Sequence, residues 1–184
     1  TEQDSCHCKL APSLEAFPGE CIVTCDDDLM VRRGWLKRLV QAHAAHPRDV
    51  IAHIARSLML DEAGSVAAYD AWPKLKTRGA VSHRLVQMGY GGVLYPPGVL
   101  HPDATNGALY MQLAPRADDL WFKFMAYLAG TRVRTASDKV RRPREIVGAQ
   151  PFPLEWDYGQ MLAECEAWLS PNSDGLLILR RQPD

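Results

Sequence analysis

The sequence predicts a single domain of the α/β class, and three observations support this. Short β-branched apolar runs alternate along the chain with longer segments whose apolar residues recur at helical spacing. The clearest strand, 21–25, runs directly into three aspartates, and the clearest helix, 33–46, follows it. The length, 184 residues, is that of one ordinary domain, which buries roughly 70% of the surface that its unfolded chain exposes.

The composition narrows the classes of partner and the cellular setting. The charged side chains nearly balance at a net charge of −1, so we expect no nucleic acid and no anionic membrane as the main partner. No apolar run approaches the ~20 residues of a membrane span, and no signal-peptide pattern opens the sequence. The five cysteines do not form the framework of a secreted disulfide protein, so we expect a cytoplasmic location.

The segment before the acidic strand is predicted to form a short helix from Lys9 to Phe17. Leu10, Leu14 and Phe17 recur at helical spacing, and a first helical turn tolerates Pro12. This helix would lead through the turn residues Pro18-Gly19 into the strand.

Four cysteines near the start raise the question of structural zinc. Cys6 and Cys8 are spaced C-x-C, and Cys21 and Cys25 are spaced C-x₃-C, whereas zinc ribbons usually show C-x₂-C. Because the strand 21–25 is expected to be buried, its cysteines are more simply explained as small buried hydrophobes. Incidental cysteines are therefore favoured over zinc.

The three aspartates at the end of the first strand are the most informative stretch. Asp26 and Asp28 project to one side of an extended backbone and Asp27 to the other. Adjacent carboxylates repel, but a divalent cation such as Mg²⁺ prefers such oxygens and would hold them together. In open α/β sheets, ligands bind beyond the carboxyl ends of strands, where this cluster falls. The alternative is a solvated acidic turn that caps the following helix.

The elements that follow alternate between helix and strand. The helix 33–46 has one apolar face and ends at Pro47, and a strand is predicted at 49–54. The runs 57–60 and 66–69 flank a turn and predict a hairpin. The apolar face of the helix comprises Trp35, Leu36, Leu39, Val40 and His43.

The second half of the chain contains a glycine-opened strand and an acid-capped helix. Gly91 and Gly92 begin a short apolar strand that Pro96-Pro97 ends, and paired glycines either permit a bulge or let backbone approach a ligand. A helix is predicted from Asp118 to Leu128. Its two leading aspartates are explained either as capping residues or as a carboxylate that deprotonates a hydroxyl.

The remaining segments are less specific. A strand is predicted at 131–136, a helix at 157–169 with apolar residues at helical spacing, and an apolar end at 176–179. Two basic stretches, 74–78 and 139–144, are either solvated loops or segments that meet phosphate charge.

The acidic and glycine-rich blocks together resemble GT-A-fold nucleotide-sugar glycosyltransferases of the bacterial polysaccharide type. The strand ending in Asp26-Asp27-Asp28, followed by Gly34-Trp35-Leu36, resembles the D-x-D region of that family. The stretches 91–97 and 117–121 resemble its second half, and the order and spacing agree from about 9 to 130. The resemblance implies a GT-A-like mixed sheet flanked by helices, in which 9–60 ends the donor and metal half, 61–150 forms the acceptor half and 151–184 is a C-terminal helix and tail.

The resemblance also implies a function and a set of site residues. The expected reaction moves a sugar from a nucleotide-diphosphate donor to a glycan or other hydroxyl acceptor, with Mn²⁺ or Mg²⁺ and with inversion, in polysaccharide or glycan synthesis. Asp26 and Asp28 match the metal-holding carboxylates, and Asp118 or Asp119 matches the base, with a slight preference for Asp119. The expected cofactor and donor contacts are made by Lys9, Asp26, Asp27, Asp28, Gly91 and Gly92.

The sequence departs from the family pattern in two respects, which leave alternatives open. Of the nucleotide-binding βαβ half, only its last helix and strand, 9–25, are recognised, so we expect either a truncated start or another way of holding the base. All six histidines lie at or before His101, so a late metal-binding histidine is missing. The alternatives are a two-metal phosphoryl or nucleotidyl transferase, a domain of this fold that binds sugars or partners without catalysis, and a zinc-stabilised N-terminal module.

Overall fold

The computed structural model describes residues 5–63, 66–73, 75, 79–136, 143–146, 169–171 and 177–179. The expected helix 157–169 lies outside these residues except for Leu169, which belongs to a strand. Most of the two basic stretches, 74–78 and 139–144, also lies outside them. No helix among the described residues is long and apolar enough to cross a membrane.

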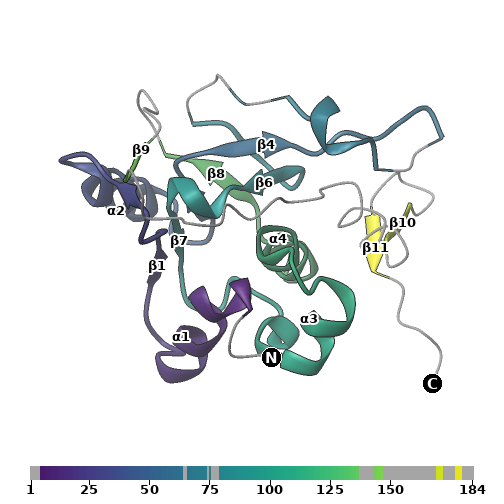
Figure 1. Cartoon of the computed structure of the whole chain (residues 1–184), viewed down its shortest axis with the longest axis horizontal. Coiled ribbons are helices and arrows are strands. Elements are labelled where there is room, and N and C mark those ends of the chain that lie inside the picture. Colours follow the sequence, from purple (N-terminus) through teal and green to yellow (C-terminus); the bar gives the residue numbers. More distant parts are fainter. Residues whose placement is uncertain are drawn as a thin grey trace.

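A mixed five-stranded sheet forms the centre of the molecule (Figure 1). Strands β3 and β8 pair in parallel, and the other neighbours pair antiparallel. The α/β class is therefore confirmed, and strands occur at the four predicted places 21–25, 49–54, 91–97 and 131–136. In spatial order the strands are β1 (Ile22–Thr24), β7 (Val93–Tyr95), β3 (Val50–Ala52), β8 (Val133–Thr135) and β5 (Val81–Ser82).

Three further strand pairs lie outside the central sheet: β2 (Leu29–Met30) with β9 (Arg144–Glu145), β4 (Ala55–Ser57) with β6 (Leu85–Gln87), and β10 (Leu169–Pro171) with β11 (Leu177–Leu179). The predicted hairpin between 57–60 and 66–69 is largely wrong. It is reduced to one bridge between Leu60 and Val66 and a neighbouring backbone hydrogen bond, because β4 pairs with the distant β6 instead.

Helices occur at the three predicted places that fall within the described residues, with shorter bounds at two of them. The expected N-terminal helix is a 3₁₀ turn followed by a short α-helix, and the helix predicted at 118–128 has the predicted bounds. The helical elements are η2 (Cys6–Lys9), α1 (Ala11–Ala16), α2 (Trp35–Ala45), η3 (Tyr69–Ala71), η4 (Gly89–Gly91), η5 (Pro102–Thr105), α3 (Gly107–Leu113) and α4 (Asp118–Leu128).

Alternate residues of the central strands face two separate apolar clusters. Val50 and Ala52 of β3 belong to the larger cluster, which includes the buried residues of α4, whereas Ile51 packs with Leu39 and Ala42 of α2. This follows from the two-residue period of a strand, which sends neighbouring side chains to opposite faces. The sheet therefore lies between α2 on one face and the α4 side of the core on the other.

Two expectations about burial are wrong. Leu36 and Val40 of α2 are 50% and 48% exposed, so the buried stripe of this helix is narrower than its apolar composition indicated. Cys21 and Cys25 are exposed and flank β1 rather than lie within it, because β1 is an edge strand of only three residues.

Helix α4 is the most buried helix among the described residues. Seven consecutive residues from Leu120 to Ala126 are buried, including Trp121, whose indole N–H donates to the Ala104 carbonyl at 3.0 Å. Trp121 is therefore a core residue. The helix ends before Gly130, whose φ of +71° suits glycine.

Candidate functional site

The three aspartates lie in the turn that joins β1 to β2. Asp26 and Asp28 are half-buried and Asp27 is exposed, but the three residues lie in a turn and not on the extended backbone that the sequence predicted. The Oδ1 atom of Asp28 is buried, and none of the described residues forms a hydrogen bond with it. A buried carboxylate oxygen without a donor is costly, so this atom indicates a place for a cation or a donor group.

Lys9 joins this turn to the start of α4. Its Nζ atom lies 2.6 Å from Oδ1 of Asp26 and 3.8 Å from Oδ2 of Asp118. The two acidic stretches, far apart in the sequence, are therefore neighbours in space. Turn η2 presents Lys9 at this point, and the Ser5 hydroxyl caps that turn by accepting from the His7 N–H.

Asp119 is fixed by the chain segment after β6. Its Oδ1 atom accepts from the Gly89 N–H at 2.8 Å, and its own carbonyl accepts from the buried Gln87 side chain at 3.0 Å. A Cβ atom at position 89 would lie 2.8 Å from the same Oδ1, so only glycine leaves room for this carboxylate. The roles of Gly89 and Gln87 in the site were not predicted from the sequence. A signal for Gly89 was present, because it lies two residues before the Gly91-Gly92 pair.

Neither aspartate caps α4. The N-cap residue is Ala117, and no side chain forms a capping hydrogen bond there. The expectation that one of the pair acts as a cap is wrong, because Gly89 binds Asp119 and Lys9 attracts Asp118. Both carboxylates are instead directed into tertiary contacts at the end of the helix where its dipole favours negative charge.

Burial shifts the proton affinity of the whole cluster. Desolvation raises the pKa of Asp118, although the nearby Lys9 charge opposes the rise. Desolvation and then the charge of Asp118 raise the pKa of Asp119 well above its usual range. For Lys9, burial disfavours the charged form, but the charges of Asp118 and Asp26 outweigh it and raise its pKa. The cluster therefore contains a firmly charged lysine and two carboxylates that are better proton acceptors than exposed ones.

Cys6 also contacts this cluster. Burial, followed by the charge of Asp118, raises the pKa of its thiol to about 12. Cys6 is therefore protonated at neutral pH and is a poor nucleophile.

The space left by the missing side chains of Gly91 and Gly92 is filled by other residues of the protein. A Cβ atom at position 92 would lie 1.9 Å from the Trp35 ring, and one at position 91 would lie 2.7 Å from Ile54. The Trp35 indole N–H donates to the Gly91 carbonyl at 2.9 Å, and Gly92 has a φ of +95°. Close packing and backbone geometry therefore account for both glycines, while their contact with a donor stays a prediction.

Among the described residues, no three His, Cys, Asp or Glu side chains converge as a ready-made metal site. This applies to the cysteine-rich start as well, where the Cys21 thiol lies 3.4 Å from Nε2 of His43. The fit of a divalent cation therefore depends on Asp26 and Asp28. The buried Oδ1 of Asp28 suits a cation, whereas Asp26 already has Lys9 as its partner.

Comparisons of the chain with models of protein families, with curated proteins and with solved structures find no match.

Proposed function

We propose that this protein is a metal-dependent glycosyltransferase that moves a sugar from a nucleotide-diphosphate donor to a hydroxyl acceptor, with inversion. One observation carries the proposal: Lys9 contacts both Asp26, after β1, and Asp118, at the start of α4. The reaction needs one group that holds the diphosphate and another that deprotonates the acceptor, close together. The two acidic stretches would supply these two groups.

Asp26 and Asp28 would hold Mn²⁺ or Mg²⁺. When bound, the cation would neutralise charge on the leaving diphosphate as a Lewis acid. Asp28 brings a buried oxygen that lacks a hydrogen bond from the described residues, and Asp26 brings a half-buried carboxylate. Lys9 would then be a charged donor suited to phosphate oxygens.

Asp119 is the preferred base of the pair. The Gly89 N–H fixes its Oδ1 atom. Burial holds its pKa well above the usual range, which strengthens it as a proton acceptor. Asp118 is the weaker candidate because Lys9 and the Cys6 thiol both stabilise its charged form.

The test is whether Mn²⁺ and a nucleoside diphosphate bind together. Calorimetry with UDP and GDP, each with and without Mn²⁺, is expected to show that each ligand tightens the binding of the other. Asp28→Ala should abolish this linkage, while Asp27→Ala, the exposed neighbour, should retain it. Equal linkage in the parent and in Asp28→Ala would reject the metal site.

The close contact between Lys9 and Asp26 favours a second candidate, a sugar-binding or partner-binding domain that does not catalyse transfer. At 2.6 Å, the lysine already neutralises a carboxylate that the enzyme would need for its metal. Calorimetry with a nucleotide-sugar, in Mn²⁺ and in EDTA, separates the two candidates, because the binding domain would take this ligand with equal affinity in both.

A further inference from the structure

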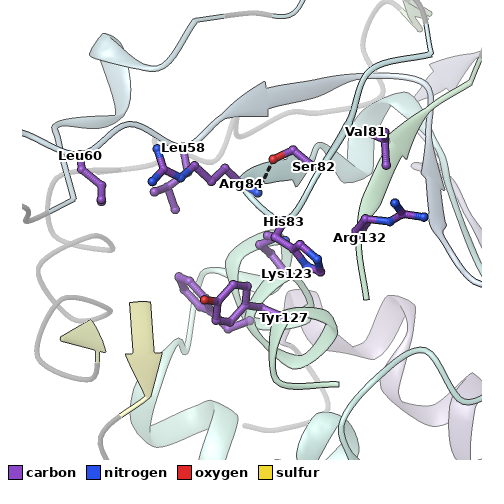
Figure 2. A pocket seen from close by; sticks show the side chains of 10 residues that line it. Leu58, Leu60, Val81, Ser82, His83, Arg84, Lys123, Tyr127 and Arg132 are labelled. Atoms are coloured by element: carbon purple, nitrogen blue, oxygen red, sulfur yellow. Dashed lines mark hydrogen bonds between the residues drawn. The ribbon is translucent and has the colours of Figure 1, made fainter. Parts of the chain in front are cut away.

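A second site lies further along α4, in a cavity of about 350 Å³ (Figure 2). Lys123 and Tyr127 of α4 face Leu58 and Arg84 across it. None of the residues of the acidic site lines this cavity, and its ligand does not depend on the proposed glycosyltransferase activity. The lining residues are Leu58, Leu60, Val81, Ser82, His83, Arg84, Lys123, Phe124, Tyr127 and Arg132.

Lys123 is the unusual member of this lining. Its side chain is 2% exposed, and its Nζ atom forms no hydrogen bond with any residue in the described part of the chain. The Tyr127 ring, with its centroid 5.9 Å from Nζ, makes a cation–π contact at the outer limit of that interaction and supplies no lone-pair acceptor for the amine. An apolar side chain of the same length would fill this place without the cost of desolvating an amine. Packing alone therefore does not explain a lysine here.

The charged residues around the cavity are all basic. His83, Arg84 and Arg132 line it together with Lys123, and no lining residue is an aspartate or glutamate. Arg132 already pairs with the buried Asp49 outside the lining, at 3.1 Å. The potential of the cavity therefore favours an anion, and the natural place for its negative group is beside Nζ of Lys123.

The apolar walls restrict the anion further. Leu58 and Phe124 are buried, and Leu60, Val81 and the Tyr127 ring extend the apolar surface. A volume of about 350 Å³ is at the small end of the range for ligand sites, which spans roughly 300–1,000 Å³. Inorganic phosphate would leave these walls in contact with water, whereas a carboxylate with a short apolar chain would cover them.

We infer that this cavity binds a small amphipathic carboxylate, with its apolar chain against Leu58, Phe124 and Tyr127 and its carboxylate paired with Lys123. The carboxylate supplies the acceptor that the buried amine lacks among the described residues. A charge-assisted hydrogen bond formed away from water is the strong kind, so the negative group should contribute much of the affinity.

The affinity should depend on pH because burial lowers the pKa of Lys123 to about 7. A bound carboxylate favours the charged amine, so binding should be tightest below this pKa and weaken as the pH rises above it. His83, whose ring meets Tyr127 edge-on at 6.2 Å, lines the same cavity, as do the charged side chains of Arg84 and Arg132. His83→Gln should retain the pH dependence of binding because it leaves the Lys123 amine in place.

The experiment compares hexanoate with 1-hexanol, which has a similar chain and no charge. In calorimetry at about pH 6, hexanoate is expected to bind at least 10-fold more tightly than hexanol. Lys123→Met should weaken hexanoate at least 10-fold and leave hexanol unchanged or tighter. Lys37→Met, an exposed lysine of α2, is the matched control and should bind both as the parent does.

A second readout uses the parent protein and needs no variant. Nitrogen-15 NMR of the lysine Nζ groups should show the pKa of one amine rising on addition of hexanoate, and the Lys123→Met spectrum assigns that signal. Equal affinity for hexanoate and hexanol, equal hexanoate binding in Lys123→Met, or no binding of hexanoate would each overturn the inference.

Discussion

The start and the middle of helix α4 treat buried charge in opposite ways. At the start of α4, Asp118 faces Lys9 and Asp119 accepts from the Gly89 N–H. One helical turn beyond Asp119, Lys123 is buried with no hydrogen-bond partner in the described part of the chain. The two carboxylates at the start of α4 therefore have partners within the fold, whereas the Lys123 amine in its middle has no hydrogen-bond partner among the described residues. Burial alone is therefore a weak guide to a binding site, whereas the absence of a hydrogen-bond partner for the buried Lys123 amine in the described part of the chain supports the proposed carboxylate site.

The largest expected effect concerns the two carboxylates at the start of α4. Asp119→Asn retains an oxygen that accepts from the Gly89 N–H but cannot take a proton, so transfer to acceptor should fall by a factor of roughly 10² to 10⁴ while thermal stability stays near that of the parent. The measurement pairs release of nucleoside diphosphate with a melting curve. Asp118→Asn is the matched variant, and its transfer rate should fall less. Parental rates in both variants would show that neither residue is the base.

The next effect concerns Lys123, where removing the charge should stabilise the fold. With its pKa lowered by burial to about 7, Lys123 binds fewer protons in the folded than in the unfolded protein between that pH and about 10.5. The stability of the parent should therefore rise with pH across this window, by at most about 1.4 kcal/mol per pH unit. Lys123→Met lacks this dependence and should exceed the parent by roughly 3 kcal/mol near pH 6.

Urea unfolding at several pH values measures this gain. The difference between Lys123→Met and the parent should shrink steadily from about pH 7 to pH 10. A less stable Lys123→Met variant at about pH 6 would mean that the amine has a partner that compensates for its burial.

The smallest effect is expected for the same lysine-to-methionine substitution at Lys9, beside the start of α4. Lys9→Met removes the ion pairs with Asp26 and Asp118 and leaves their carboxylates to repel each other. Because Lys9 is partly exposed, the expected loss is at most about 1 kcal/mol at neutral pH. Protonation relieves the repulsion, so the loss should diminish as the pH falls towards 5. A destabilising Lys9→Met together with a stabilising Lys123→Met would establish the contrast between the two lysines. A stabilising Lys9→Met would contradict it.

Local signals predicted α4 well and its surroundings poorly. The apolar spacing after Asp118 and the stop at Gly130 define the helix within the sequence itself, so its bounds are as predicted. In α2, by contrast, Leu36 and Val40 are apolar and exposed, and apolar composition does not tell which side of a helix the fold buries. The partner of β4 was also missed, because a hairpin signal competes with a distant strand that only the tertiary fold brings near.

The candidate site shows the same division. Asp26, Asp28, Asp118 and Asp119 stand out in the sequence as carboxylate clusters, but the contacts of Lys9 with two of them depend on the tertiary fold. Lys123 was missed altogether. Its signal is a single basic residue within the apolar run from Leu120 to Met125, which would place an amine on the buried side of a helix.

The strand order of the central sheet has a consequence for how the chain folds. No neighbouring pair in the order β1-β7-β3-β8-β5 joins strands that are consecutive in the sequence. Both partners of β3 come later in the chain, and the second of them ends at Thr135. Such a sheet has a high contact order, because long loops must close before any pairing can form, and folding in milliseconds to seconds is the usual result. During synthesis both edges of β3 therefore stay unpaired with their partners in this sheet until first β7 and then β8 have been synthesised.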